Sequence, residues 1–269
     1  MSALAFSLRE APPERLDLSP LTPGRLTGLT LPEIERLPVG TTRLGVRVGD
    51  VFTVTAGNAG DIRLLGGSAR LDNVGRGLAA GRITVEGDVG QRLGFAMAGG
   101  EIVVTGAAGP FAASGARGGT VRIGGDADER AGGAVHGAMA GLDGATLIIG
   151  GRAGPRLGDR MRRGLILVRG AAGDHAGARM IAGTILAPAV GRHPGIGMRR
   201  GTILTSRHGG LLPTFVETGR HDLVFLRLLR RTLDALAPDF ADLVPATVRR
   251  FAGDLATLGK GEILLPADA

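Results

Sequence analysis

The side chains of this sequence that could do chemistry are arginines and a few histidines, since cysteine, tryptophan and tyrosine are absent. The five histidines are His136, His175, His193, His208 and His221. His175 and His193 each lie two residues before a glycine of a repeated motif, so we expect them to stack, with Arg156 in the same column. Two histidines lack the third ligand of a zinc site, and no Ser-His-Asp order or placed pair of carboxylates stands out. We therefore predict no catalytic residue and no metal site in this chain.

Arginine supplies almost all of the positive charge, because the formal net charge is +7 and Lys260 is the only lysine. Guanidinium groups bind carboxylates and phosphates through paired hydrogen bonds. We predict that six arginines on adjacent late turns of the repeat bind an anionic ligand or an acidic partner: Arg156, Arg160, Arg162, Arg163, Arg199 and Arg200. The alternative interpretation is a solvated arginine face in a protein from a GC-rich genome.

The composition disfavours several classes of partner. A basic chain often binds nucleic acid, but here no aromatic side chains alternate with the arginines to stack on bases. Residues 1–20 hold five charged side chains, which is not typical of a signal peptide. No apolar run approaches the roughly 20 residues of a membrane-spanning helix. We expect a cytoplasmic protein with neither nucleic acid nor membrane among its partners.

A thirteen-residue motif, Gly-x-x-Met-x-x-Gly-x-Ile-x-Val-x-Gly, recurs through the middle of the chain. His175, His193 and the arginines discussed above fall at fixed positions relative to it. Residues 94–106 (GFAMAGGEIVVTG) and 158–170 (GDRMRRGLILVRG) have every fixed position, and residues 75–87 (GRGLAAGRITVEG) differ only at Leu78. With looser copies, the motif begins at residues 75, 94, 113, 139, 158, 177 and 195. A step near 19 residues is typical of stacked repeats. The seven extra residues at 126–138 can also be placed differently, which leaves the start at Met139 open.

Each copy predicts one turn of a stack. Its alternating end, such as Ile83 and Val85, puts two apolar side chains on one face of a strand. A further inward column precedes it: Leu78, Met97, Ala116, Leu142, Met161, Met180 and Met198. The predicted fold is mainly β, a right-handed parallel β-helix of about seven rungs with a small N-terminal cap and C-terminal helices. The expected division is a cap at residues 1–60, the solenoid at 61–210, and a helical cap and tail at 211–269.

The two ends of the chain depart from the repeat. Short strand-like pieces are expected at residues 44–48 and 51–55. Residues 222–236 (DLVFLRLLRRTLDAL) have a charged face and an apolar face, which predicts a helix, and Pro245 is expected to open a second helix. Its inward residues would be Val248, Phe251, Leu255 and Leu258. The tenth motif position carries four outward aliphatic side chains that the C-terminal helices or a partner subunit should cover: Ile148, Leu167, Leu186 and Leu204.

The repeat and both flanks resemble the C subunit of the formylmethanofuran dehydrogenase family. Residues 18–23 (LSPLTP) and 31–39 (LPEIERLPV) resemble the leader of that family, and residues 253–255 (GDL) and 259–264 (GKGEIL) resemble its tail. The copies at Ala113 and Met139 depart from the motif. The same repeat is similar to the C-terminal domain of the large glutamate synthase subunit.

The resemblance implies a non-catalytic scaffold subunit whose active sites lie on other subunits. In methylotrophic bacteria, the formyltransferase/hydrolase complex of this family moves a formyl group from formyl-tetrahydromethanopterin to a furan cofactor and hydrolyses it to formate. The partners implied are an amidohydrolase-like hydrolase subunit, a formyltransferase subunit and a linking subunit. The cofactor implied is of the methanofuran type with a glutamate-rich tail, which the six arginines would guide. The excess of arginine over lysine favours this bacterial branch.

Two alternatives stay open at this point. The chain could be the C subunit of an archaeal-type tungsten or molybdenum formylmethanofuran dehydrogenase, and the identity of the neighbouring subunits would separate the two branches. It could also be a glutamate-synthase-like structural domain, which co-purification with a glutamine amidohydrolase would indicate. In the first two cases the chain belongs to an enzyme complex, and in none of the three is an active site expected in the chain itself.

Overall fold

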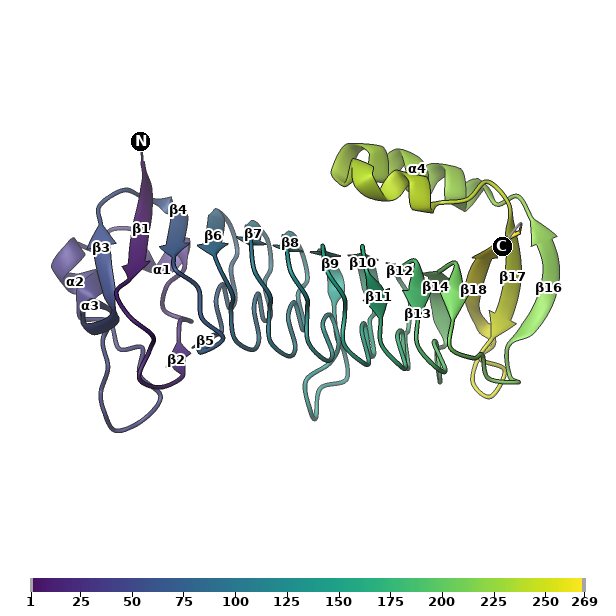
Figure 1. The fold of residues 1–269 in the computed structure, drawn as a ribbon, viewed down its shortest axis with the longest axis horizontal. Helices are drawn as coiled ribbons and strands as arrows, with labels where there is room; N and C mark the ends of the chain where they lie inside the picture. The colour runs from purple at the N-terminus through teal and green to yellow at the C-terminus, as the bar shows by residue number, and fades with distance from the viewer. Residues whose placement is uncertain (1, 268–269) are drawn as a thin grey trace.

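The computed structural model describes residues 2–267 and is mainly β, with one large mixed sheet of 13 strands and few helices (Figure 1). The strand order is β16-β17-β18-β14-β12-β10-β9-β8-β7-β6-β4-β1-β3. Their bounds are β1 Ala3–Leu8, β3 Phe52–Thr55, β4 Asn58–Leu65, β6 Arg82–Glu86, β7 Glu101–Val104, β8 Thr120–Ile123, β9 Asp143–Ile149, β10 Arg163–Val168, β12 Thr184–Leu186, β14 Arg200–Leu204, β16 Val216–His221, β17 Val248–Gly253 and β18 Lys260–Pro266. Strands from successive copies of the motif therefore lie side by side.

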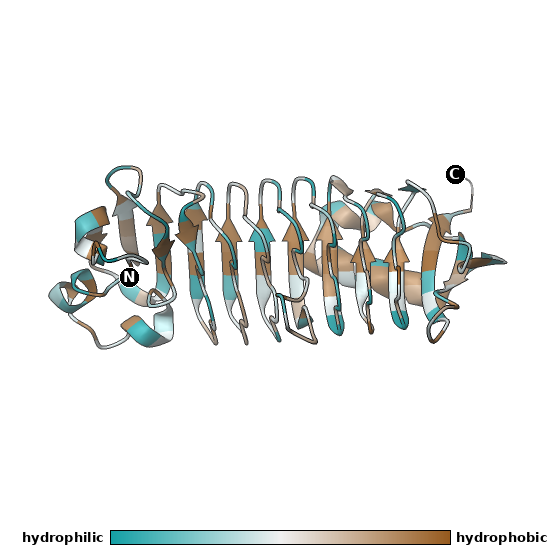
Figure 2. Cartoon of the chain, turned by 90° about the horizontal axis from the view of Figure 1, so that it is seen from below, coloured by the Kyte–Doolittle hydropathy of each residue, from teal (hydrophilic) through white to brown (hydrophobic). Residues whose placement is uncertain are grey.

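The strands from β6 to β14 pair in parallel, each with the equivalent strand of the next copy. The register matches the motif, so that Ile83 lies opposite Ile102. Alternation puts these side chains on the inner face, and hydrophobic residues accordingly follow one another along the middle of the stack (Figure 2). The methionine column is inside as predicted, since four side chains are 0% exposed: Met97, Met161, Met180 and Met198.

A second line of parallel pairing runs along another side of the stack. Three short strands form a separate sheet there: β11 Ala171–Ala172, β13 Ala189–Val190 and β15 Arg207–His208. Isolated parallel bridges continue the line through Val89, Ala108, Ala127 and Ala153. Small side chains suit this line because neighbouring coils, each consisting of one copy of the motif with its connection, lie one strand spacing apart.

Glycine is required at the seventh motif position for two reasons, which Gly119 illustrates. Its φ is +79°, a left-handed conformation that glycine adopts without strain. A Cβ added to Gly119 would lie 2.4 Å from the carbonyl oxygen of Gly100 in the preceding coil. The coils can therefore stack at this corner only if no side chain is present.

The N-terminal part of the chain contains three short helices, α1 Pro23–Leu26, α2 Leu31–Glu35 and α3 Val48–Val51. A two-stranded parallel sheet joins β2 Leu16–Asp17 to β5 Leu71–Asp72, which lies beyond residue 60. The strand predicted at residues 44–48 is wrong, whereas β3 lies within the piece predicted at 51–55. The Asp50 side chain accepts a hydrogen bond from the backbone N–H of Arg47, at 2.7 Å. This contact caps the first turn of α3 at Val48, so the strand predicted for residues 44–48 does not form.

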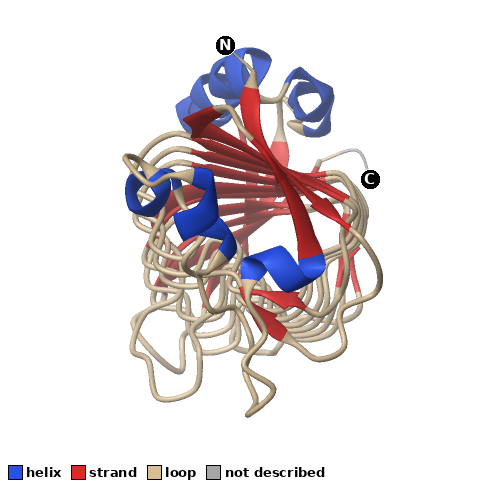
Figure 3. Ribbon diagram, turned by 90° about the vertical axis from the view of Figure 1, so that its left-hand side faces the viewer, coloured by secondary structure: helices blue, strands red, loops and turns tan. Residues whose placement is uncertain are grey.

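The helix predicted at residues 222–236 is confirmed by α4, Val224–Leu236. Its buried side chains, Leu226, Leu229 and Leu233, pack in one cluster with the four outward aliphatic side chains of the sheet: Ile148, Leu167, Leu186 and Leu204. The expectation that a C-terminal helix covers this column is therefore confirmed, and α4 lies on the outer side of the stack (Figure 3). The apolar face of α4 is wider than this contact, because Phe225 and Leu228 are exposed.

The second helix predicted after Pro245 is wrong. A 3-10 helix, η1 Pro238–Leu243, follows α4, and the apolar residues Val248 and Phe251 then lie in strand β17. This strand pairs antiparallel with β18 on one side and with β16 on the other. Residues 248–253 form a strand and not a helix because β18, the last parallel strand, would otherwise have an unpaired edge. Leu255 and Leu258, which the prediction places on the inward face of that helix, are 57% and 48% exposed.

Candidate anion-binding site

The backbone hydrogen bonds place the irregular fourth copy of the motif at Gly132. Its N–H donates to the carbonyl of Ala112, and the N–H of Gly158 donates to the carbonyl of Ala131, the pattern of a first motif glycine. The prediction that this copy starts at Met139 is therefore wrong. Residues 133–140, here called the inserted loop, leave the stack after Gly132, and Leu142 N–H returns to the carbonyl of Gly132 at 2.7 Å. The loop projects beside β9 in Figure 1, and Met139 is 75% exposed.

This register puts Arg130 in one column with Arg156, His175 and His193, and Arg92 fills the equivalent position in an earlier coil. The backbone N–H of Arg130 donates to the carbonyl of Pro155, and those of Arg156 and His175 donate in the same way to the next coil. The φ angles of these three residues and His193 lie between +53° and +62°. The expected stack of His175 on His193 is confirmed, with ring centroids 5.9 Å apart. Arg130 was missed by sequence reasoning, because it joins the column only when the copy starts at Gly132.

A buried carboxylate joins this column to a neighbouring one. The Asp159 side chain is 0% exposed and accepts from Arg130 Nη1 at 3.2 Å and from Arg179 Nε at 2.9 Å. Arg179 Nη2 donates to the second oxygen, so the pair is bidentate. The hydrogen bond that Arg179 donates to Asp159 raises the pKa of Arg179 above its ordinary value. Both guanidinium groups are thereby held in fixed positions.

These side chains line a pocket of about 270 Å³ beneath the inserted loop. The other side chains that face it include those of Arg156, Arg160 and His136. Arg160 Nη1 lies 3.5 Å from the carbonyl oxygen of Ala138 and 3.2 Å from the Met139 sulfur, which ties the loop to the stack. The ring of His136 packs edge-on against Phe111, with centroids 5.5 Å apart. Within residues 2–267, Arg156 has neither a hydrogen-bond partner nor an ion-pair partner for its side chain.

The structure divides the six arginines predicted to act together. Arg156 and Arg160 lie in the pocket and are half-buried, whereas four are exposed elsewhere: Arg162, Arg163, Arg199 and Arg200. Arg163 Nε is paired with Asp143 at 3.0 Å. The prediction of adjacent turns is wrong for the exposed four, because β12 lies between β10 and β14. The spacing of the copies at 158, 177 and 195 already contained this separation.

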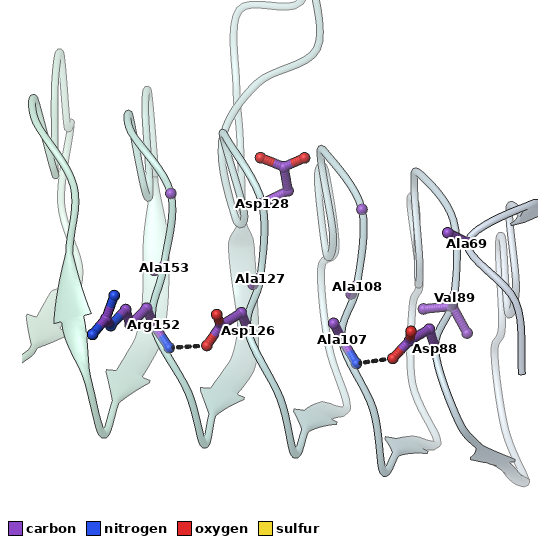
Figure 4. A pocket seen from close by; sticks show the side chains of 12 residues that line it. Ala69, Asp88, Val89, Ala107, Ala108, Asp126, Ala127, Asp128, Arg152 and Ala153 are labelled. Carbon is purple, nitrogen blue, oxygen red and sulfur yellow. Dashed lines mark hydrogen bonds between the residues drawn. The ribbon is translucent and has the colours of Figure 1, made fainter.

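A wider, shallow groove of about 490 Å³ lies along the line of alanines and carries three aspartates (Figure 4). Two of them are engaged by the backbone of the next coil: Asp88 accepts from Ala107 N–H at 2.8 Å and Asp126 from Arg152 N–H at 2.7 Å. These carboxylates therefore link coils. Across residues 2–267, no three His, Asp or Glu side chains are grouped to hold a metal ion. No helix in that range has the length and apolar character needed to cross a membrane.

The fold and the site together define a mainly β repeat protein with a basic pocket on one corner of its stack. No family model matches the chain. It is 58% identical over 261 residues to the Fhc C subunit of the formyltransferase/hydrolase complex of Methylorubrum extorquens, and the match covers 97% of this chain and 98% of that protein. The chain therefore belongs to the family of formyltransferase/hydrolase complex C subunits.

A solved structure gives the same result. The crystal structure of the formyltransferase/hydrolase complex FhcABCD from Methylorubrum extorquens, in complex with methylofuran, contains a chain that matches with a TM-score of 0.95. The two chains are 57% identical, and the match covers 98% of this chain and 99% of that one. The resemblance drawn from the motif is confirmed, in favour of the bacterial complex over the archaeal dehydrogenase and the glutamate synthase domain.

Proposed function

We propose that this chain is the C subunit of a formyltransferase/hydrolase complex and serves there as a non-catalytic scaffold. The observation that carries the proposal is the 58% identity to the Fhc C subunit along nearly the full length of both chains. The complex would move a formyl group from formyl-tetrahydromethanopterin to a methanofuran-type cofactor and hydrolyse it to formate. Its hydrolase, formyltransferase and linking subunits would be the partners, and the chain would act in the cytoplasm.

The scaffold itself is proposed to be a right-handed parallel β-helix of about seven rungs. The in-order parallel pairing from β6 to β14 supports this, as does the second parallel line through β11, β13 and β15. In this proposal the N-terminal cap spans residues 1–60, the solenoid 61–210 and the C-terminal cap and tail 211–269. A stack of this kind presents surfaces on several sides while each coil contacts only its neighbours.

The arginines are proposed to guide the anionic, glutamate-rich tail of the furan cofactor. A tethered cofactor reaches two active sites at a higher effective concentration when its tail is held between them. Exposed ion pairs contribute only ~0.2–1 kcal/mol each, so affinity would depend on several arginines and would fall with salt. Arg156 and Arg160 in the pocket and Arg199 and Arg200 on the exposed side would be separate points along such a path.

The scaffold role is tested by purifying the chain alone and assaying it with formyl-tetrahydromethanopterin and the furan cofactor. We expect the rate of the blank, and full turnover only with the other subunits present. Turnover by the isolated chain would overturn the scaffold role. Capture of the natural complex followed by mass spectrometry should find formyltransferase and hydrolase subunits, and capture of a glutamine amidohydrolase instead would contradict the assignment.

The tail-guiding role is tested in the assembled complex by replacing Arg160, Arg162, Arg163, Arg199 and Arg200 with serine. We expect weaker cofactor binding and a smaller dependence of that binding on salt. An intact complex with unchanged affinity and unchanged salt dependence would identify these arginines as a solvated face.

A further inference from the structure

We propose that the pocket beneath the inserted loop is a carboxylate-binding site, in which the side chains of Arg156 and Arg160 hold an incoming carboxylate group. The proposal rests on the tail-guiding role in one respect, because it specifies how two of those arginines would bind a carboxylate. Its test uses this chain alone, so it can fail while the chain still assembles as a scaffold. The size and charge of the pocket suit a small dicarboxylate, and glutarate is the compound used to test this.

The charges that face the pocket are unbalanced. Four guanidinium groups line it, and Asp159 is the one carboxylate among its lining residues. Asp159 pairs with Arg130 and Arg179, which leaves Arg156 and Arg160 without a carboxylate. Two uncompensated positive charges in one concave surface attract an anion, and the partial exclusion of water strengthens that attraction.

Asp159 shows which anion the pocket accommodates. Its carboxylate lies between two guanidinium groups and receives a bidentate contact from Arg179. Arg156 and Arg160 provide a second pair of guanidinium groups in the same pocket, so a second carboxylate would meet the same planar donors. Arg160 uses one nitrogen on the inserted loop, and Arg156 uses none within residues 2–267. The donors for an incoming group are therefore available.

The turns of the repeat do not themselves require arginine at the positions of these four side chains. All four adopt a left-handed conformation, with φ between +54° and +59°, which costs roughly 1–3 kcal/mol for a residue other than glycine. The turn itself does not need arginine, because the position of Arg160 is filled by Gly77 and Gly197 in other coils, with φ of +67° and +69°. Other coils adopt the same conformation with other residues, such as Asn73 and Ala96, so the conformation belongs to the repeat and only the choice of arginine is particular to the pocket.

The inserted loop encloses the pocket and limits what can enter. Pockets for drug-sized ligands occupy roughly 300–1,000 Å³, and the volume here is about 270 Å³. A short acid, or the end of a longer acidic molecule, fits this space better than a large ring system. The loop is held by Arg160, so the same side chain contributes to the enclosure and to the charge.

The test is calorimetric titration of the full chain with glutarate at low ionic strength. Arg156→Gln and Arg160→Gln should each weaken binding about tenfold or more, because each removes a charged hydrogen-bond donor. The matched controls are Arg36→Gln and Arg43→Gln, which change exposed arginines far from the pocket in sequence and absent from its lining, and should leave the affinity within about twofold. Arg156→Lys keeps the charge but loses the planar guanidinium group. Its affinity for glutarate should therefore lie between those of the glutamine variants in the pocket and those of the controls.

Arg156→Gln removes no side-chain hydrogen bond or ion pair within the described residues, so circular dichroism should show an unchanged fold. The wild-type chain should also lose affinity for glutarate as salt is raised. An absence of glutarate binding, or equal losses in the pocket and control variants, would overturn the proposal. Inorganic phosphate that binds the pocket more tightly than glutarate would overturn the carboxylate assignment, whereas weaker phosphate binding would support it.

Discussion

The attachment of α4 to the stack should depend on single leucines of the outward column. Leu186 is 1% exposed and lies between Leu167 and Leu204 in the column that α4 covers. Replacement of a buried leucine by alanine costs about 2–5 kcal/mol, depending on how far the site collapses. Leu186→Ala leaves the inner column intact, because Ile185 and not Leu186 faces the core of the stack. The loss should therefore fall first on the docking of the helix.

Hydrogen exchange of the α4 amides measures this local opening. A loss of about 2–3 kcal/mol would lower their protection roughly 30- to 150-fold, while the strands β6 to β8 keep theirs. Thr84→Ala is the matched control, since Thr84 fills the same motif position in a coil outside the α4 cluster. It should change stability by less than about 0.5 kcal/mol. Unchanged α4 protection in Leu186→Ala would show that other contacts hold the helix, and would refute this account.

Three further predictions concern the stack and its C-terminal edge. Met161→Ala removes a side chain that is 0% exposed and should lower the free energy of unfolding by about 2–5 kcal/mol in urea titrations followed by circular dichroism; a loss below about 1 kcal/mol would contradict its role in the core. Gly119→Val should lower the melting temperature far more than Gly137→Val, because both have φ near +80° but only Gly119 has backbone in the way; equal losses would attribute the effect to φ alone. The Arg249 hydrogen bond holds the pKa of Glu217 below its ordinary value of 4.5, so this pair stabilises the chain above that pH, and the stabilisation is lost as the pH falls through the lowered pKa. Glu217→Gln should therefore flatten the decline in melting temperature below pH 4.5, and an unchanged decline would show that the pair contributes nothing.

The inner columns of the stack could be predicted from sequence because their physical cause is periodic. A side chain such as Met97 or Ile102 recurs at a fixed offset from a glycine, so a single rule places it in every coil. The same reasoning identified α4 and the column beneath it, since an unpaired apolar stripe at residues 148–204 needs a cover. Each of these inferences depends on spacing within one copy or on the addition of one copy to the next.

The pocket could not be predicted in full, because it depends on contacts between copies. Arg130, Asp159 and Arg179 belong to three different coils, and they meet only in the register that begins the fourth copy at Gly132. The sequence allows Met139 equally well, and the backbone hydrogen bonds decide between the two. The second C-terminal helix failed for a related reason: the apolar spacing of residues 248–258 fits a helix, but pairing with β18 satisfies more backbone groups.

The number of coils sets the length of the stack, and hence the distance between its two ends. Each coil advances the axis by about one strand spacing, roughly 4.8 Å. The N-terminal helices α1 to α3 lie at one end of the stack and the strands β16 and β17 at the other (Figure 1). Removal or duplication of one 19-residue unit, such as residues 94–112, would preserve every pairing register while moving the two ends closer or farther by that amount. Anything that binds near both ends would then be held at a distance set by the number of copies and adjustable only in whole steps.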